Sequence, residues 1–463
     1  MAQISDKIST IEKELDLQSF TFRGENVWPI IRIGIYLSST KTTHASAFSY
    51  GNAIRFLLEG ALLFFYNRIA SWFGSKNLDS VIVTSSHYKV KEGNQVHDRI
   101  IDPVVNYLQA KNSRFSVWEF TAKYKYDTNI SYRSFLRPVQ KELYFLSFIR
   151  KLNRLRKKSV LQGDVTKLNA LLAAHDISFR VDGGFSNKLE VIFSQAQFFQ
   201  KILKAQRVKS VFVVAYYDVK CFSVLLAANR LGLRSVDLQH GVQGQNHMAY
   251  ARWPKEIFST SNFLPTHFYV WDENSKQTIA RWKPETENIL LGCNKWFLDR
   301  AKKISNDLIL LTLQPIDDFL PDYVIKIIQD YQGDKMWAIR LHPRQMGDMA
   351  KVEERLAKAG LSAKTEVKNA STVPLTSLLE RTAIHTTYYS SVAIEASYYN
   401  IPTYFLGEEY LIHYTSYLDS ELIYCYPGHD ISNVITEISR EGAITSRKGE
   451  DRVNVLDTFV NGK

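Results

Sequence analysis

Hydrophobic residues along the chain form short runs that alternate with stretches of helical periodicity. In the first half, the runs that predict strands are Ser80–Ser85, Phe115–Phe120, Ile177–Val181, Ser210–Ala215 and Arg234–Leu238. Between them, helical spacing predicts helices at Asp98–Lys111, Asn187–Gln206 and Val219–Leu231. The second half predicts further strands at His267–Trp271, Asn288–Leu291, Leu308–Thr312, Met336–Leu341, Ala363–Val367, Ala383–His385 and Thr403–Leu406. Such alternation predicts parallel sheets covered by helices on both faces.

The alternation breaks in an aromatic and proline-rich stretch between Pro254 and Pro265. We therefore expect an α/β protein made of two doubly wound, Rossmann-like domains that face an interdomain cleft. The first domain is expected over residues 1–255, with a helical insertion at about 126–160, and the second over 256–430. A C-terminal helix and basic tail are expected over residues 431–463.

Composition places the chain among globular proteins, because 45% of its residues are hydrophobic and 23% are charged. Cys221, Cys293 and Cys425 are too widely spaced for a metal or redox motif, which predicts reduced thiols in the core. The N-terminus is charged and lacks the apolar core of a signal peptide. These features favour a cytoplasmic protein.

Two features raise the alternative of peripheral contact with the inner face of the inner membrane. The apolar stretch Phe56–Phe73 is interrupted by Glu59 and Arg68, so it is too short and too charged to span a bilayer. It predicts a core-facing amphipathic helix or, alternatively, a membrane-docking one. The chain also has a net charge of +11, and six of its cations lie between Arg150 and Lys158. This basic cluster is expected either to form a solvated helix face or to attract anionic lipid or an acidic glycan. Nucleic acid is not an expected partner, since the chain has no nucleic-acid-binding motif.

Polar motifs follow the predicted strands directly. In the first half they are Ser86-His87-Tyr88, Tyr216-Tyr217-Asp218 and Gln239-His240-Gly241. In the second half they are Gln314-Pro315, His342-Pro343-Arg344 and Tyr389-Ser390-Ser391. Because open α/β sheets bind ligands outside the carboxyl ends of their strands, we expect the functional site at these edges.

The second domain carries the motifs expected of a nucleotide-phosphate site. Ser390 and Ser391 stand where a helix should begin, which is where backbone amides attract phosphate. Glu395 follows one turn later and is expected to accept hydrogen bonds from ribose, unless it only complements the helix dipole. His342 is expected to donate to phosphate and Arg344 to pair with it, while Gln314 completes this set.

These motifs resemble those of bacterial glycosyltransferases of capsule and lipopolysaccharide synthesis that use CMP-activated acidic sugars. The resemblance rests on His342-Pro343, on Ser390-Ser391 and on the run AANRLGLRSVDLQHGVQG at residues 227–244. It extends over roughly residues 28–430 and is nearest to the retaining β-Kdo transferases. The resemblance implies the GT-B fold, with an acceptor domain first and a CMP-binding domain second. Sialyltransferases of this type carry an acidic pair before glycine, whereas Val181-Asp182-Gly183-Gly184 has one acid.

The first domain supplies the candidates for chemistry. In a retaining double displacement, a carboxylate attacks the anomeric carbon, and Asp237 is the candidate nucleophile. His240 is expected to position it or to contact the donor, and Asp182 is the candidate general base. For both acids, a purely structural role in a turn or cap is the alternative. The residues expected to bind substrate are Gln239, His87, Tyr217 and Lys295, with His247 and Arg252 as further candidates for holding the donor carboxylate.

We therefore expect a metal-independent enzyme that transfers Kdo from CMP-Kdo to a surface polysaccharide or lipopolysaccharide. Asp317-Asp318 lacks the Asp-x-Asp spacing of metal-dependent sugar transferases, and CMP has no diphosphate to clamp. The alternatives are a sialyltransferase, another nucleotide-sugar or polyol-phosphate transferase of capsule synthesis, or a non-catalytic scaffold with the same fold.

Overall fold

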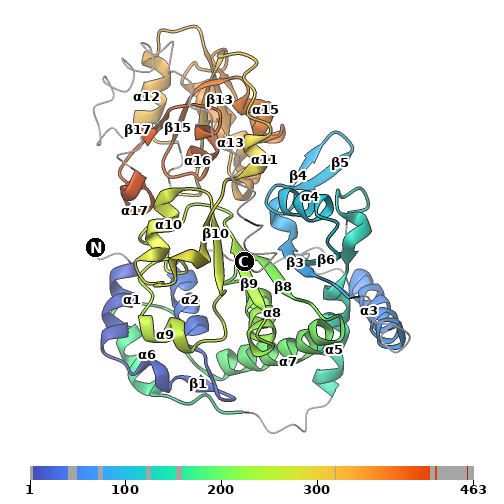
Figure 1. Ribbon diagram of the computed structural model, residues 1–463. Helices are drawn as coiled ribbons and strands as arrows, with labels where there is room; N and C mark the ends of the chain where they lie inside the picture. The colour runs from blue at the N-terminus through green and yellow to red at the C-terminus, as the bar shows by residue number, and fades with distance from the viewer. Residues whose placement is uncertain are drawn as a thin grey trace. The chain divides into compact units, whose positions relative to one another are not determined.

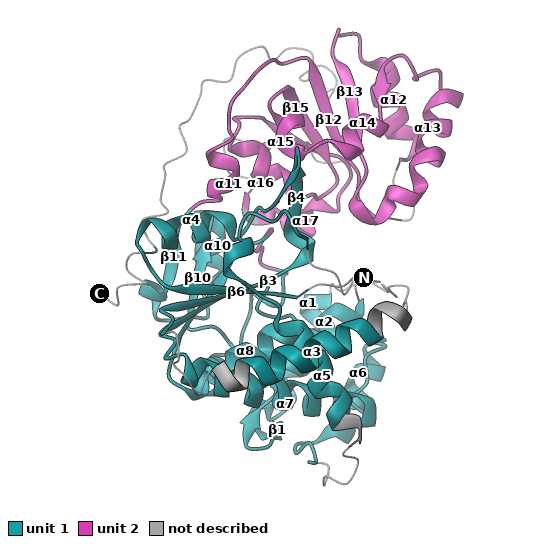
Figure 2. Ribbon diagram, turned by 90° about the vertical axis from the view of Figure 1, so that its right-hand side faces the viewer, with its two compact units in different colours: residues 1–240, 246–292, 453–463 teal, residues 241–245, 293–452 magenta. Residues whose placement is uncertain are grey.

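A computed structural model describes residues 4–39, 50–70, 77–120, 127–152, 159–316, 318, 320–417, 423–424 and 456. The chain divides into two compact units, coloured separately in Figure 2. Unit 1 contains residues 1–240, 246–292 and 453–463, and unit 2 contains residues 241–245 and 293–452. Each unit has its own parallel sheet with helices packed around it (Figure 1).

Among the described residues, the sheet of unit 1 has seven strands in the order β11-β10-β9-β8-β3-β6-β7. All neighbouring strands in it are parallel. In chain order the strands are β3 (Ser80–Ser85), β6 (Phe115–Phe120), β7 (Leu136–Arg137), β8 (Ser210–Val214), β9 (Arg234–Leu238), β10 (His267–Val270) and β11 (Ile289–Leu291). The chain runs outward from β3 to β7 and then returns to the other side of β3. The topological switch point therefore lies between β3 and β8, where such sheets open a ligand crevice.

Some helices of unit 1 begin at residues whose side chains satisfy their first amide groups. Aspartates cap four of them: α6 (Val165–Ala174), α7 (Gly183–Ala205), α8 (Val219–Arg230) and α10 (Glu273–Ala280). The others are α1 (Ile4–Lys13), α2 (Trp28–Ser39), α3 (Tyr50–Ala70), α4 (Asp102–Ala110), α5 (Val139–Leu152) and α9 (Lys255–Thr260). Two short antiparallel hairpins join them, β1 (Thr21–Phe22) with β2 (Glu25–Asn26) and β4 (Lys89–Glu92) with β5 (Gln95–Asp98). One continuous apolar core connects the helices to the sheet.

Unit 2 repeats this wiring on a smaller scale. Its sheet has the order β14-β13-β12-β15-β16-β17 among the described residues, again with parallel neighbours. The strands are β12 (Leu308–Thr312), β13 (Met336–Arg340), β14 (Thr365–Glu366), β15 (Thr382–Thr387), β16 (Thr403–Phe405) and β17 (Ile423–Tyr424). Its helices are α11 (Lys295–Leu298), α12 (Asp322–Asp330), α13 (Met349–Lys358), α14 (Lys368–Thr372), α15 (Leu375–Leu379), α16 (Val392–Ser397) and α17 (Tyr410–His413). The switch point of this sheet lies between β12 and β15.

The prediction of two doubly wound α/β units is confirmed, but one predicted strand is wrong. Residues 177–181 form no strand and instead connect α6 to α7 in irregular conformation. The side chain of Asn169 donates to the Val181 carbonyl at 2.9 Å and accepts from its amide at 3.0 Å. Ile177 and Val181 remain buried. The alternating apolar pattern of this segment therefore reflects its contact with the core. The Asn169 side chain makes the backbone hydrogen bonds that a neighbouring strand would otherwise make.

The predicted boundary near residue 255 differs from the one in the structure. Strand β10 pairs with β9, and β11 pairs with β10, so residues 256–292 belong to unit 1. Pro254–Pro265 is thus a connection inside one unit, and the transition falls at Gly292–Cys293. The predicted C-terminal helix and tail, residues 431–463, lie outside the described residues apart from Leu456.

Helix α3 contains most of the apolar stretch predicted from the sequence, and it packs on α5 (Figure 2). The contact is close, because a Cβ added at Gly60 would collide with the Lys141 carbonyl oxygen. The predicted helix exists, but its core-facing character is only half right. Leu58 and Leu62 on α3 are 60% and 72% exposed. Within the described residues, no helix is long and apolar enough to cross a membrane.

Candidate functional site

At the switch point of unit 1, residues from three neighbouring strands meet in an aromatic cluster. Tyr88 follows β3, Tyr217 follows β8 and His240 follows β9. His240 Nε2 lies 3.1 Å from the Tyr217 hydroxyl, and the Tyr88 and His240 ring centroids are 5.6 Å apart. The strand order β3-β8-β9 brings these positions together at one edge. Two predicted residues, Tyr217 and His240, are therefore in direct contact.

His240 is held in its neutral form. Burial lowers its pKa to about 4, because a charged imidazolium would lose its hydration, and the nearby Arg99 cation acts in the same direction. Its Nδ1 atom is buried and has no hydrogen-bond partner among the residues that the structure describes. At neutral pH this ring can accept or donate a single proton at Nδ1 according to its tautomer.

Asp237 is fully buried at the end of β9. One carboxyl oxygen accepts a hydrogen bond from the Tyr216 amide at 2.9 Å, and the other accepts from the Tyr250 hydroxyl at 2.8 Å. Burial nevertheless raises the pKa of Asp237 to about 8, and these two hydrogen bonds only partly oppose the shift. In this arrangement the carboxyl group has no surface exposed to a substrate, so attack on a sugar requires the Tyr250 hydroxyl to move.

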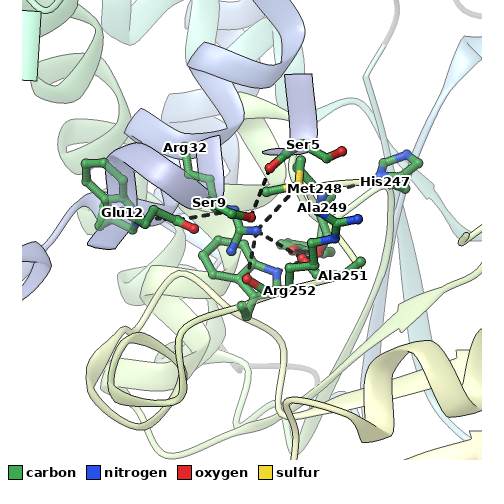
Figure 3. Close-up of polar contacts among 12 residues, drawn as sticks. Ser5, Ser9, Glu12, Arg32, His247, Met248, Ala249, Ala251 and Arg252 are labelled. Carbon is green, nitrogen blue, oxygen red and sulfur yellow. Dashed lines mark hydrogen bonds and ion pairs between the residues drawn. The ribbon is translucent and has the colours of Figure 1, made fainter. Parts of the chain in front are cut away.

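A buried arginine holds the segment that carries Tyr250. The Arg32 guanidinium donates to the carbonyl oxygens of Ala251 and Arg252, both at 3.0 Å, as Figure 3 shows. Its Nε lies 3.5 Å from a Glu12 carboxyl oxygen, and its charge lies 4.2 Å from the Trp253 ring centroid. Helices α1 and α2 are thereby tied to the loop that shapes the Asp237 cluster.

Burial acts on both members of this ion pair. It raises the pKa of Glu12 and lowers the pKa of Arg32, and the attraction between the two opposes both shifts. Glu12 also accepts a hydrogen bond from the Trp28 indole at 2.8 Å. The Arg32 side chain has no solvent exposure, and that of Glu12 has 6%. Because both side chains are buried, bulk water cannot take the place of either partner in this ion pair.

Other predicted residues of unit 1 lie outside this cluster. Asp182 is exposed and caps α7 by accepting from the Phe185 amide at 2.9 Å. The Gln239 amide is buried, accepts from the Trp271 amide at 2.6 Å and donates to the Ser275 hydroxyl at 3.1 Å. Its contacts join β9 to the start of α10. His87 is exposed in the turn after β3.

In unit 2, the strand order β13-β12-β15 places the three predicted motifs side by side at the carboxyl edge of the sheet. Gln345 joins two of them. Its side chain accepts from the His342 amide at 3.2 Å and donates to the Gln314 carbonyl at 2.9 Å. The His342 ring accepts from the Arg344 amide through Nδ1 at 3.2 Å. The ring's remaining nitrogen, Nε2, is therefore the proton-bearing atom of the neutral form.

In the third motif, which follows β15, one of the two serines is already hydrogen-bonded within the protein. Ser390 is buried, and its carbonyl accepts from the Tyr414 hydroxyl at 2.5 Å. Ser391 is half-buried and stands at the N-cap of α16, with no side-chain hydrogen bond there. Glu395 is buried inside the same helix. Because Glu395 is buried and Ser391 is only half-buried, the hydroxyl of Ser391 is better placed for a ligand than the carboxylate of Glu395.

Arg344 gives this edge its positive charge. The residue is exposed, and it forms no ion pair among the described residues. It is close enough to Tyr389 to lower the pKa of that hydroxyl, although burial and the Glu409 carboxylate raise it by more. A free guanidinium beside hydroxyl and imidazole groups is suited to a phosphate.

The residues expected to hold a donor carboxylate are not gathered in one place. Lys295 is in α11 of unit 2 and pairs with Asp299 at 2.8 Å. Arg252 pairs with Asp6 at 2.6 Å. His247 packs between aromatic rings, with its centroid 4.9 Å from that of Tyr250. Among the residues that the structure describes, no three His, Cys, Asp or Glu side chains are grouped as metal ligands, and metal independence stays a prediction.

Sequence reasoning missed four residues that shape these edges: Tyr250, Arg32, Glu12 and Gln345. Tyr88 and Tyr389 stood in the predicted strand-end motifs, but no role was predicted for them. Arg32 lies far in sequence from the strand end that it organises, whereas Tyr250 lies 13 residues from Asp237. Gln345 had a local signal, because it stands three residues after His342 in a capping box.

Comparison of the sequence with known protein families and with curated proteins gives no match. Among solved structures, the chain is similar to UDP-GlcNAc 2-epimerase from Methanocaldococcus jannaschii, with a TM-score of 0.51, 12% identity, and 83% of this chain and 99% of that chain covered. The lipopolysaccharide outer core galactosyltransferase WaaB follows at a TM-score of 0.42, 9% identity and coverage of 78% and 89%. The wall teichoic acid polymerase TagF also gives 0.42, at 10% identity and coverage of 90% and 91%.

The chain has the GT-B fold. Its two doubly wound sheets and the likeness to the epimerase, over nearly the whole of that enzyme, agree on this point. At this level of identity the likeness defines the fold, and the argument for function rests on the side chains at the two sheet edges.

Substituting Arg32 with leucine should lower the free energy of unfolding of unit 1 by about 3–5 kcal/mol, because Glu12 would be left as a buried charge without its partner. The double variant Arg32→Leu, Glu12→Leu should recover a large part of this loss. Thermal unfolding followed by circular dichroism measures both effects. Equal midpoints for wild type and Arg32→Leu would show that the pair does not hold this part of the fold.

Asp237 should make stability depend on pH. Its folded-state pKa of about 8 is above the ordinary 3.8, so the folded form keeps a proton that the unfolded form releases. The stabilisation is complete below about pH 4 and is lost as pH rises through about 8. The unfolding midpoint of Asp237→Asn relative to wild type should therefore rise between pH 5 and pH 9. Asp218→Asn, at an exposed helix cap, is the matched control and should show a constant offset. Parallel profiles for Asp237→Asn and wild type would contradict the buried, protonated carboxyl.

Proposed function

We propose that the chain is a glycosyltransferase that moves a sugar from a nucleotide donor to a glycan or glycolipid acceptor. The observation that carries the proposal is the carboxyl edge of the sheet of unit 2. There, the segments that follow β13 and β15, the two neighbours of β12, present an imidazole, two serines and an exposed arginine without an ion-pair partner among the described residues. A phosphate with a nucleoside attached is the ligand that this set of donors suits best.

We further propose that the donor is CMP-Kdo. A nucleoside monophosphate needs one cluster of hydrogen-bond donors and no metal clamp. His342, Arg344 and Ser391 can supply such a cluster. The epimerase with the same fold is named for a nucleotide sugar, UDP-GlcNAc, which supports the class of donor and leaves the base open. The choice of CMP and Kdo rests on the motif resemblance at His342-Pro343 and Ser390-Ser391.

For the reaction we propose double displacement with Asp237 as the nucleophile. Its carboxylate oxygen would form a bond to the anomeric carbon as the bond from that carbon to the CMP phosphate oxygen breaks. The acceptor hydroxyl would then displace Asp237, restoring the original configuration and giving up its proton. We assign this proton to His240, which is neutral, in place of Asp182, which caps a helix. The Tyr250 hydroxyl must release Asp237 before the first step.

The proposed acceptor is a growing surface polysaccharide or lipopolysaccharide, and the proposed location is the cytoplasm at the inner membrane. The basic charge of the chain suits an anionic glycan or an anionic lipid surface.

Nucleotide binding tests the donor assignment. CMP should bind the wild type, and His342→Ala should weaken this binding by about 1.5–3 kcal/mol, the contribution of a hydrogen bond to a charged group. Titration calorimetry with CMP, UDP, GDP and CDP measures it. Gln329→Ala, at an exposed position of α12 in the same unit, is the control and should bind CMP as the wild type does. Unchanged CMP affinity in folded His342→Ala, or preference for UDP, would overturn the assignment.

Transfer assays test the nucleophile. Asp237→Asn should abolish Kdo transfer and leave CMP affinity intact, because the proposed nucleotide site is in unit 2. In the wild type, kcat/KM should rise with pH through about 8 as the carboxylate forms. Intact-protein mass spectrometry without acceptor should show a sugar adduct on the peptide containing Asp237. An inverted product, or substantial turnover by Asp237→Asn, would reduce this residue to a structural role.

A further inference from the structure

We propose that helix α3 docks unit 1 on an anionic membrane surface. The helix has a continuous apolar stripe that the protein leaves open to solvent. The residues of the stripe recur about every four positions, and their exposed fractions are 60%, 60%, 72%, 56% and 70% for Ile54, Leu58, Leu62, Phe65 and Tyr66. This spacing places them along one side of the helix.

Apart from Phe65, whose ring lies 6.0 Å from that of Phe145 on α5, the stripe is separate from the face that packs on the protein. Phe56 is buried, and its ring lies 5.9 Å from that of Tyr144 on α5. Phe64 packs on Phe145 of α5 with centroids 5.7 Å apart. Gly60 faces the α5 backbone. Because these contacts already fix α3, the exposed stripe is not needed to hold the helix in place.

Single exposed apolar side chains are ordinary on protein surfaces, but a row of five large ones on one helix is not. The described part of the stripe includes the aromatic residues Phe65 and Tyr66, and aromatic rings favour the boundary between lipid headgroups and acyl chains. Since no described helix is able to cross a membrane, the stripe fits a helix lying in the plane of the surface.

Charge favours an anionic surface over a second protein copy. Glu59, the one acid in the sequence of α3, forms ion pairs with Arg55 and Lys141. Glu142 of α5 is buried and pairs with Arg137 at 3.1 Å. In the sequence, α3 and α5 together carry five basic residues against two acids, Glu59 and Glu142, which gives the helix pair a net charge of +3. The basic residues are Arg55, Arg68, Lys141, Arg150 and Lys151. Two copies of such a helix pair would bring like charges together, while phosphatidylglycerol headgroups would be attracted to them.

Vesicle sedimentation with the full chain tests this proposal. Wild type should bind vesicles of phosphatidylglycerol and phosphatidylcholine, with weaker binding to phosphatidylcholine alone and in 0.5 M salt. Leu58→Glu combined with Leu62→Glu should weaken binding at least tenfold. Ile304→Glu, at a similarly exposed apolar residue of unit 2, is the matched control and should bind as the wild type does.

Further measurements distinguish loss of membrane binding from loss of folding and from loss of nucleotide binding. Thermal unfolding checks that the double variant is folded, and the milder Leu58→Ala, Leu62→Ala pair, which keeps helix propensity, should also lose binding. CMP affinity should be the same in all these variants, so failure of the membrane proposal is distinct from failure of the donor assignment. Absence of vesicle binding by the wild type, or equal binding by the double variant, would overturn the proposal. So would a wild-type dimer that the glutamates dissociate without any vesicle binding, because the partner would then be a second copy.

Discussion

The buried guanidinium of Arg32 is the constraint on which the Asp237 cluster of unit 1 depends. Two backbone carbonyls, a carboxylate and an indole ring surround this buried cation. Such a group is costly to bury, so the fold keeps it only with its partners in place. The partners come from α1 and from residues 251–253, which the sequence separates widely. Arg32 therefore fixes the loop that presents Tyr250 to Asp237.

The two sheet edges use polar groups in different ways. In unit 2, Gln345 ties together two of the three strand-end motifs, and Arg344 stays exposed, an arrangement that suits the proposed phosphate site. In unit 1 the carboxyl group is enclosed by tyrosines, and burial keeps its proton on at neutral pH. In the proposed double displacement, this enclosed carboxyl group with its raised pKa would become a reactive nucleophile only when the substrate opens the enclosure.

Much of the architecture could be predicted from the sequence, because parallel strands buried on both faces are read directly as apolar runs. Strands β3, β8 and β9 fall where the pattern placed them, and their carboxyl ends identified Tyr217 and His240. The same logic failed for residues 177–181, where Asn169 substitutes for a strand partner, since an apolar alternation carries no information on hydrogen bonding. The boundary was misplaced because prolines mark a change of direction and do not say which sheet the next strand joins. Gln239 was predicted to bind substrate because the local sequence does not show that its side-chain amide is already hydrogen-bonded to Trp271 and Ser275.

The order of strands in unit 1 also bears on how the chain is made. Strand β3 lies inside the sheet of unit 1, and one of its neighbours is β8, with Ser80 paired to Ser210. The equivalent pair in unit 2 joins Leu308 to Thr382, so the stretch of chain between the paired strands is longer in unit 1. Closing the longer loop costs only about 0.5 kcal/mol more, since the entropy of closure grows with the logarithm of length. The delay is the larger effect. At 5–20 residues per second, the ribosome needs on the order of ten seconds to reach β8 after β3 has emerged. During that interval an apolar strand destined for the middle of the sheet has an open edge, so unit 1 is the part of this protein that most needs protection from aggregation while it is being synthesised.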